Sequence, residues 1–367
     1  MRALRGAIVG FGFIAERGHL PAYRGRRTDA RSFEIVAVAD TCPARREQAQ
    51  RAIPGVRVYE SHLSLLAAER ARLDFIDVAT PPRAHASVAI AALDCGLHVL
   101  CEKPLSTTAE DAHKMIARAR AQGRVLFPCH NYKHAPVIKT VDRLLDAGAI
   151  GRVHLVTLDT FRNTHARGVA EWRPDWRRDR RMAGGGIAMD HGSHTFYLAA
   201  SWLRSSATSI TAKMSASGTH DTEDNFACTI TFPAGVATAR LTWNAGVRKV
   251  IYTLHGDHGA IRIEDDDVEV TIREGVDSSA PVRTTRERVG SDWMDASHAS
   301  WFQSMQDQFA EAIAAGDCVG KEALEALRCV ELIACAYASA RAGCREIELP
   351  QEDTLGAPGL PSAECAS

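Results

Sequence analysis

The first third of the chain alternates short apolar runs with longer amphipathic segments. Strand-like runs rich in β-branched residues occupy positions 6–11, 34–39, 56–59, 75–79, 97–101 and 124–129. Helix-like segments separate them at 14–23, 44–52, 63–69, 84–95 and 108–122. The first two strand-like runs are apolar at successive positions, as strands buried on both faces of a sheet are. This alternation predicts a doubly wound parallel sheet of the Rossmann type.

The pattern changes after residue 134. A helix-like segment at 136–147 precedes runs in which apolar and polar residues alternate, at 153–161, 209–215, 226–232, 237–243, 249–255, 260–264 and 268–273. Such alternation, with turn residues between the runs, predicts a large and mostly antiparallel open sheet. Two helix-like segments, 297–315 and 321–342, and a short strand at 345–349 follow. We therefore expect one domain over 1–130, a second over 131–350 and a loose tail over 351–367.

Composition agrees with two domains and excludes several classes of partner. The chain has 367 residues, more than the roughly 250–300 at which one hydrophobic core stops growing. Lys and Arg total 44 against 45 Asp and Glu, so no overall basic charge attracts nucleic acid or an anionic membrane. No apolar stretch approaches the roughly 20 residues that span a bilayer, and we expect no signal peptide before the first strand. We expect a cytoplasmic protein.

The cysteines are scattered along the chain. There are 10 of them, without the C-x-x-C spacing that a structural zinc site usually has. We expect reduced cysteines that serve as small apolar residues, and no metal site.

A glycine-rich turn joins the first strand to the first helix. It reads G-F-G-F-I-A at positions 10–15. Gly10 allows a tight turn, Gly12 lets the backbone approach a pyrophosphate, and Ala15 permits close packing of helix on strand. A plain glycine turn is the alternative, but the position between strand and helix favours a dinucleotide site at the helix N-terminus. The residues expected to contact the dinucleotide here are Gly10, Phe11, Gly12, Phe13 and Ile14.

Asp40 ends the second strand. A carboxylate there accepts hydrogen bonds from the ribose hydroxyls and repels a 2′-phosphate, so the sequence favours NAD over NADP. Arg45 and Arg46 follow closely and would act against that preference. A carboxylate at a strand end is also a common helix N-cap, which is the structural alternative.

Three further strand ends carry polar residues to the same edge of the predicted sheet. They are T-P-P-R-A-H at 80–85, E-K-P at 102–104 and C-H-N-Y-K at 129–133. Open α/β sheets bind ligands at the carboxyl ends of their strands. We therefore place these further residues at the cofactor: Thr80, Pro81, His85, Glu102, Lys103 and Asn131.

In the order of these motifs the sequence resembles the Gfo/Idh/MocA oxidoreductases, which include glucose-fructose oxidoreductase and inositol dehydrogenase. The resemblance continues through Trp176-Arg177, the A-G-G-G of 183–186 and Asp190-x-Gly192-x-His194. It implies an NAD(P)-binding Rossmann domain and a C-terminal domain whose large sheet forms a homodimer or homotetramer. It also implies that Lys103, Asp190 and His194 line a substrate pocket between the domains, beside the nicotinamide.

Further substrate contacts are expected, and the sequence departs from the family pattern at two positions. The residues expected at the substrate are Lys103, Tyr132, Arg162, Trp176, Arg177, Asp190 and His194. Tyr197 stands where many relatives have an acidic residue, and Lys133 where an arginine is frequent. Both departures leave the identity of the substrate open.

The chemistry of these residues agrees with oxidation of a secondary alcohol. Asp190 and His194 are four residues apart on a helix-like segment and share one face, whereas His191 points about 100° away. A histidine near neutral pKa suits removal of the hydroxyl proton. Lys103 stabilises negative charge on the oxygen, and Asp190 holds the hydroxyl or the imidazole. The sequence thus predicts an NAD-dependent oxidoreductase acting on CH–OH of a sugar, sugar derivative or cyclitol, with the direction open.

Two alternatives stay open for the function. An NAD-dependent glycosidase would use transient oxidation to eliminate an aglycone, and a non-catalytic sensor would bind dinucleotide or sugar without chemistry.

The segment 162–181 holds seven arginines together with Trp172 and Trp176. This composition is typical of a site for an anionic sugar, or of a solvated loop that clasps a neighbouring subunit or the Rossmann domain.

Overall fold

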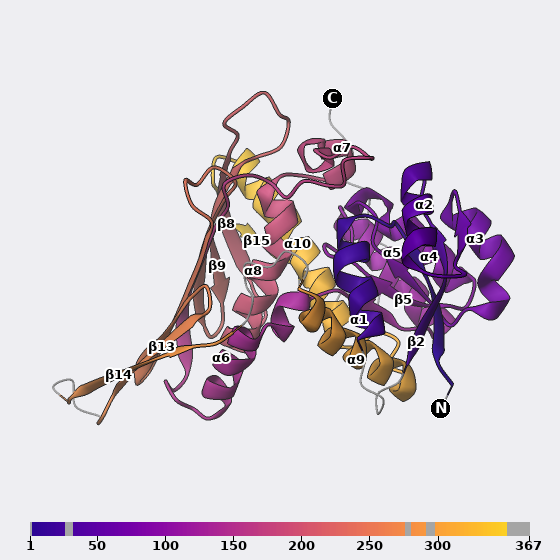
Figure 1. Cartoon of the computed structure of the whole chain (residues 1–367). Coiled ribbons are helices and arrows are strands. Elements are labelled where there is room, and N and C mark those ends of the chain that lie inside the picture. The colour runs from indigo at the N-terminus through magenta and orange to yellow at the C-terminus, as the bar shows by residue number, and fades with distance from the viewer. Residues whose placement is uncertain (1, 26–31, 276–279, 291–297, 351–367) are drawn as a thin grey trace.

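The computed structural model describes residues 2–25, 32–275, 280–290 and 298–350. The tail expected over 351–367 and the first residue of the helix expected over 297–315 lie outside these ranges. Figure 1 shows two sheets with helices between and around them.

The first sheet has six parallel strands in the order β3-β2-β1-β4-β5-β6, which confirms the predicted Rossmann topology. Its strands are β1 (Leu4–Val9), β2 (Phe33–Ala39), β3 (Arg57–Tyr59), β4 (Phe75–Val78), β5 (His98–Cys101) and β6 (Leu126–Pro128). The central strands are apolar throughout because helices cover both faces. Ala7, Ile8 and Val9 of β1, for example, are all buried.

The helices of this half are α1 (Leu20–Arg24), α2 (Pro43–Ala52), α3 (His62–Glu69), α4 (His85–Asp94) and α5 (Ala109–Gln122). The helix expected over 14–23 is split, because a π-helical turn (Ala15–His19) precedes α1. His19, at the end of that turn, is fully buried.

The second sheet has nine strands in the order β14-β13-β12-β11-β7-β10-β9-β8-β15. They are β7 (Val153–Phe161), β8 (Ser209–Ser215), β9 (Asn225–Phe232), β10 (Gly235–Thr242), β11 (Lys249–Gly256), β12 (Gly259–Glu264), β13 (Asp267–Arg273), β14 (Val282–Arg288) and β15 (Ile347–Glu348). β7 and β10 run parallel and the other neighbours antiparallel, as predicted for a mostly antiparallel sheet.

β14 was not predicted from the sequence. Six of the seven residues in V-R-T-T-R-E-R are polar and all seven are exposed, so the strand has no alternation to detect. It pairs with β13 along its whole length, and the hairpin extends away from the rest of the molecule in Figure 1.

Helices cover one face of the large sheet. They are α6 (Pro136–Asp146), α8 (Ile187–Leu203) and α10 (Lys321–Arg341), and they lie between the two sheets in Figure 1. α9 (Ala299–Ala315) and a short α7 (Arg180–Ala183) complete the set among the described residues.

The C-terminal helices join the two halves. Phe302 and Phe309 of α9 pack into the core of the Rossmann half, while Trp301 packs into the core of the large sheet. α10 is divided in the same way, with Ala326 in one core and Ile333 in the other. The first core is therefore completed by segments that lie far from it in sequence, and the division at residue 130 stays a prediction.

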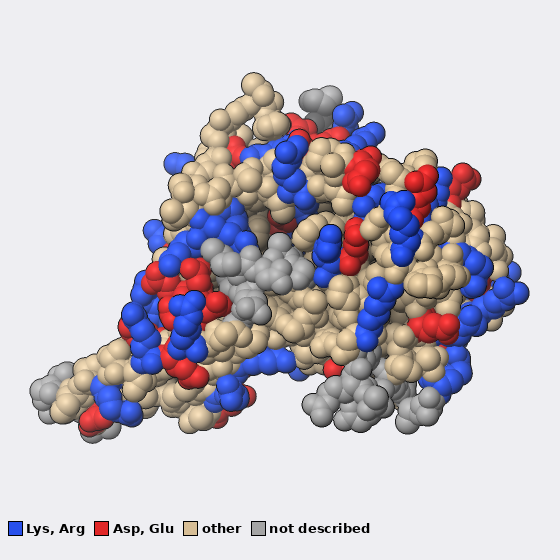
Figure 2. Space-filling view, in the orientation of Figure 1, with Lys and Arg blue, Asp and Glu red and all other residues tan. Residues whose placement is uncertain are grey.

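The surface carries both signs of charge. On the face seen in Figure 2, Lys and Arg side chains lie among Asp and Glu side chains. None of the helices within the described ranges is both long enough and apolar enough to cross a membrane. The expected cytoplasmic location stays a prediction.

Candidate active site

A cavity of about 900 Å³ lies between the carboxyl edge of the first sheet and the N-terminal end of α8. The glycine turn and Asp40 line one end, and Lys103, Asp190 and His194 line the other. The segment 162–169 borders the same cavity. It thus joins the predicted cofactor and substrate positions in one space.

The glycine turn has the geometry that a dinucleotide requires. Gly10 has φ +91°, and a Cβ there would lie 2.7 Å from the carbonyl oxygen of Ala79, so only glycine fits without strain. A Cβ on Gly12 would meet no heavy atom within 4 Å. Nothing in the protein itself requires glycine at position 12, whereas close approach of a pyrophosphate would.

Phe11 does not line the cavity. Its ring is fully buried in the core beneath the turn, and its backbone N–H donates to Asp40 Oδ2 at 2.7 Å. Phe13 and Ile14 do line the cavity. The buried Phe11 ring thus anchors the turn. The backbone of the turn faces the cofactor position.

Asp40 is held at the rim of the cavity by two backbone donors, Phe11 N–H and Cys42 N–H at 2.8 Å. Each carboxylate oxygen keeps a lone pair for another donor. Arg45 is buried and turned inward, where it donates to Phe11 O at 2.8 Å and pairs with Glu16. Arg46 donates to Asp40 O at 2.7 Å. Both arginines therefore have partners within the protein.

All three further strand ends also reach the cavity. Thr80, Pro81, Glu102 and Asn131 all line it. His85 does not, because it is buried with its two ring nitrogens each 2.8 Å from a backbone carbonyl oxygen, one of Thr80 and one of Pro104. Its position ties together the two loops that line the cavity.

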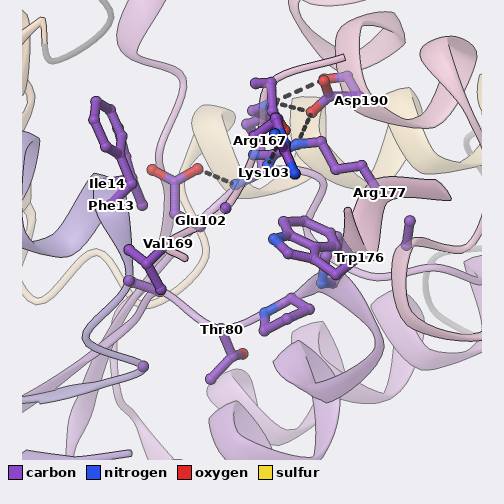
Figure 3. A pocket seen from close by; sticks show the side chains of 18 of the residues that line it. Phe13, Ile14, Thr80, Glu102, Lys103, Arg167, Val169, Trp176, Arg177 and Asp190 are labelled. Atoms are coloured by element: carbon purple, nitrogen blue, oxygen red, sulfur yellow. Dashed lines mark hydrogen bonds and ion pairs between the residues drawn. The ribbon is translucent and has the colours of Figure 1, made fainter. Parts of the chain in front are cut away.

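At the inner end, Lys103 and Asp190 meet across the two halves of the protein. Lys103 Nζ donates to Asp190 Oδ1 at 3.1 Å and to the Asp190 backbone oxygen at 2.8 Å. Arg177 Nε lies 3.4 Å from the same Oδ1, and Figure 3 shows both cations directed at Asp190. Burial alone would raise the pKa of Asp190, but the charges of Lys103 and Arg177 bring it well below its usual value. Asp190 is therefore an anion.

His194 lies beside this pair in a closely packed setting. Its ring stacks on Tyr132 with the centroids 3.8 Å apart, and its Nδ1 lies 2.7 Å from the Tyr197 hydroxyl. Burial, followed by the nearby charge of Lys103, brings the pKa of His194 well below 6.5. The imidazole is therefore neutral at neutral pH, and Nε2 is the nitrogen left for the cavity.

The two departures from the family pattern lie behind the cavity. Tyr197 is fully buried, and Lys133 pairs with Glu325 at 2.6 Å. A carboxylate in place of the Tyr197 hydroxyl would favour the protonated imidazole, whereas a phenol can donate to or accept from Nδ1 without adding charge. Tyr197 thus acts on the protonation of His194 and makes no contact with the cavity.

Helical spacing predicted that His191 points away from the site, yet the structure shows that it lines the cavity. Its Nε2 lies 3.7 Å from Asp190 Oδ2, and burial, with positive neighbours, lowers its pKa to about 3. The cavity wraps around the first turns of α8, so residues 100° apart on the helix both reach it. Helical periodicity gives no signal for this.

The glycines at 184–186 have a structural explanation. A Cβ on Gly185 would collide with the Tyr337 hydroxyl, and one on Gly186 with the backbone of Glu223. Gly185 and Gly186 also line the cavity. Contacts within the chain, rather than freedom to approach a ligand, are sufficient to require glycine there.

Beneath the E-K-P loop lies a buried charged group that the sequence analysis did not detect. His19 Nδ1 is 2.7 Å from Asp77 Oδ2, and its Nε2 is 3.0 Å from Glu102 Oε1. Because both nitrogens face carboxylates, the doubly protonated ring satisfies both contacts. Burial would lower the pKa of His19, but Asp77 and then Glu102 raise it to about 10. The other Glu102 oxygen accepts from Lys103 N–H at 3.0 Å.

The same group includes Cys129, whose sulfur lies within 4.8 Å of the ligand atoms of His19 and Glu102. That spacing is compatible with a metal ion. A protonated His19, however, has no free nitrogen lone pair to offer, so the contacts fit a network of charged hydrogen bonds.

Comparison with known proteins places this geometry in a family. Residues 4–130 match the family model described as "Oxidoreductase family, NAD-binding Rossmann fold", and residues 138–262 match the "GFO/IDH/MocA C-terminal domain". The chain belongs to the Gfo/Idh/MocA family. The resemblance carried by the ordered motifs is thereby confirmed.

Curated relatives within this family match over part of their length. D-apiose dehydrogenase of Paraburkholderia graminis is 36% identical over 151 residues, which cover 41% of this chain and 38% of that protein. Levoglucosan dehydrogenase of Pseudarthrobacter phenanthrenivorans is 32% identical over 130 residues, which cover 34% and 31%. The matched segments thus span about a third of each relative.

A solved structure of levoglucosan dehydrogenase in complex with NADH superimposes with a TM-score of 0.83 at 22% identity. The match covers 95% of this chain and 100% of that one. At this identity the comparison establishes the Gfo/Idh/MocA fold over both halves.

The His19 network makes stability depend on pH in a defined direction. A folded-state pKa of about 10 against 6.5 in the unfolded chain means that the contribution of His19 is complete below pH 6.5. It is lost as the pH rises towards 10, with a limiting slope of about 1.4 kcal/mol per pH unit. We predict that His19→Gln lowers the free energy of unfolding in urea at pH 7 and flattens this alkaline decline.

Parallel pH curves for the wild type and His19→Gln would contradict the assignment. If the variant does not fold, NMR of the wild-type protein with nitrogen-labelled histidine side chains, recorded at pH 8, gives the same information. Two protonated ring nitrogens on His19 are expected, and one proton on the ring would exclude the imidazolium.

Proposed function

We propose that the protein is an NAD-dependent dehydrogenase or reductase that transfers a hydride between nicotinamide and a secondary hydroxyl or ketone of a sugar, sugar derivative or cyclitol. The observation that carries the proposal is the pairing of Lys103 with Asp190, beside a neutral His194, at the far end of the cavity from the glycine turn. When bound along this cavity, NAD would supply the hydride acceptor.

Each of the three side chains has a defined part. His194 Nε2 takes the hydroxyl proton, because burial keeps the imidazole neutral, although its pKa lies below the near-neutral value expected from the sequence. Lys103 has three N–H donors and gives two to Asp190, so one remains for the substrate oxygen, where negative charge develops. Asp190 stays anionic and fixes the direction of Lys103.

The wall beside them suits a polyol. Trp176 lines the cavity, and the Arg177 guanidinium lies 4.2 Å from the centroid of its ring. An aromatic face packs against the C–H face of a sugar ring, while charged groups at its edge bind hydroxyls. Asn131 and Tyr132, from the loop after β6, and Arg162, directly after β7, also line the cavity and offer further polar groups.

The test is a panel of cyclitols, aldoses, uronic acids and nucleotide sugars, followed by the absorbance of reduced nicotinamide. We predict that Lys103→Met and His194→Asn each lower kcat by roughly 10²- to 10⁴-fold, because proton transfer and charge stabilisation are lost. The dissociation constant for NAD should change less than about threefold, because neither residue lies at the glycine turn. Lys114→Met, a surface lysine paired with Glu110, is the matched control.

Unaltered turnover in both variants would refute the assigned parts. Release of an aglycone from a glycoside without net formation of NADH would instead support the glycosidase alternative. Binding of NAD without turnover of any substrate would support the sensor.

The rim at Asp40 supports a preference for NAD over NADP. The carboxylate is held by two backbone N–H donors, and Arg45 and Arg46 have partners within the protein. We predict that Asp40→Ala reduces the ratio of NADP to NAD dissociation constants by roughly tenfold or more, because repulsion of the 2′-phosphate is removed. Gly12→Ala serves as the control and should weaken both dinucleotides equally. A wild type without preference would contradict the proposal.

We also propose that the uncovered face of the large sheet pairs with a second copy of the chain. No described helix lies on this face in Figure 1. A row of threonines crosses five adjacent strands there, made of Thr211, Thr229, Thr238, Thr157 and Thr253. A row of small, uncharged side chains of this kind suits self-association through a two-fold axis.

Sedimentation velocity tests this pairing. The wild type should sediment as a dimer or tetramer, and Thr238→Arg should shift it towards the monomer, because a charge would be buried between the copies. A monomeric wild type at micromolar concentration would contradict the pairing.

A further inference from the structure

Cations outnumber their carboxylate partners at the inner end of the cavity. Lys103, Arg162 and Arg177 line it, and within the described part of the chain Asp190 is the carboxylate that pairs with any of them. Glu102 also lines the cavity, but its oxygens are taken by His19 and by the Lys103 backbone. Lys103 and Arg177 therefore share one carboxylate, and Arg162 lies at the same end of the cavity without an ion pair to it.

Arg162 is the cation whose charge is not balanced. It follows β7, where its backbone N–H donates to Thr242 O at 2.9 Å and fixes its position. Its side chain is half-buried and donates to the Tyr132 hydroxyl at 3.3 Å. No carboxylate of the described residues lies within 4 Å of its guanidinium. A partly desolvated guanidinium with a phenol as its partner is a ready site for an anion.

Tyr132 connects this guanidinium to the reacting centre. Its ring lies flat on His194, with 3.8 Å between centroids and 9° between planes, while its hydroxyl contacts Arg162. One small molecule could therefore bind Arg162 through an anionic group and His194 Nε2 through a hydroxyl. The charge of Arg162 also contributes to lowering the pKa of His191 in the cavity wall, next to burial.

Arg177 offers a second donor at the same end. Its Nη1 donates to Ala166 O at 2.9 Å and its Nε is shared with Asp190, which leaves Nη2 for a ligand. Stacking on Trp176 holds the guanidinium plane in place. A planar carboxylate matches such fixed N–H donors better than a neutral hydroxyl does.

We propose that the substrate is a carboxylated sugar or polyol, a uronate or an aldonate, whose carboxylate binds Arg162. The inference rests on the proposed function, because the same molecule presents its secondary hydroxyl to His194 and Lys103. In the oxidation the hydride passes from carbon to NAD⁺ and the hydroxyl proton to His194. The carboxylate is unchanged and serves to orient the molecule.

The experiment compares molecules that differ in the carboxylate. D-Glucuronate, D-galacturonate and D-mannuronate are paired with D-glucose, D-galactose and D-mannose, and glucose 6-phosphate is included as a different anion. kcat and KM are measured for the wild type, for Arg162→Gln and for Arg118→Gln, an arginine on α5 that pairs with Asp94 outside the cavity. Binding of each uronate to the NADH complex is measured by calorimetry.

We expect the wild type to prefer at least one uronate over its aldose by roughly tenfold or more in kcat/KM, as a charge-assisted hydrogen bond gives. Arg162→Gln should remove that preference by raising KM for the uronate much more than KM for the aldose, and it should abolish uronate binding in calorimetry. Arg118→Gln should behave as the wild type. NAD affinity should be unchanged in both variants.

Several results would overturn the inference. Equal use of uronates and aldoses, or a preference for glucose 6-phosphate, would exclude a carboxylate subsite. Weaker NAD binding in Arg162→Gln with an unchanged uronate preference would assign the arginine to the cofactor. If no sugar is oxidised the proposed function fails, whereas calorimetric binding of uronates that Arg162→Gln removes still supports the anion site.

Discussion

The ion pair between Lys103 and Asp190 is the contact on which the rest of the site depends. Lys103 comes from the loop after β5 in the Rossmann half, and Asp190 from the first turns of α8 beside the large sheet. Both side chains are largely removed from solvent, with exposed fractions of 16% and 14%. Desolvation of two charges is costly unless their geometry and further hydrogen bonds compensate, and here the Asp190 backbone oxygen and Arg177 do so.

Behind this ion pair, negative and positive side chains alternate towards the core of the Rossmann half. Glu102 accepts from the Lys103 backbone, His19 lies between Glu102 and Asp77, and each positive group has a negative neighbour. The arrangement fixes the loop that carries Lys103 from beneath, through His19 and Asp77, which do not line the cavity. It also explains the opposite protonation of two buried histidines, since His19 faces two carboxylates whereas His194 faces a phenol and an ammonium.

Sequence patterns predicted the elements whose apolar residues recur regularly. The six Rossmann strands, the long helices and most of the large sheet followed from such periodicity. β14 was not predicted, because six of its seven residues are polar and all seven are exposed. Only its pairing with β13 defines it as a strand. The use of α9 and α10 in both cores is a tertiary arrangement, and helical periodicity shows only that each has an apolar face.

For the site, motif order predicted which residues meet but not what surrounds them. Lys103, Asp190 and His194 line one cavity as the family resemblance implied. His19 lies 83 residues before Glu102 in the sequence, and its position depends on a π-helical turn that apolar patterning cannot distinguish from an α-helix. His85 was expected to contact the cofactor, but its nitrogens instead bind two backbone carbonyls.

A crystal structure with NADH and a bound sugar acid or polyol tests the central claim most directly. The account predicts the nicotinamide between Thr80 and Lys103, with one substrate oxygen within hydrogen-bond distance of both Lys103 Nζ and His194 Nε2. A nicotinamide elsewhere, or a substrate oxygen that contacts neither group, would contradict it.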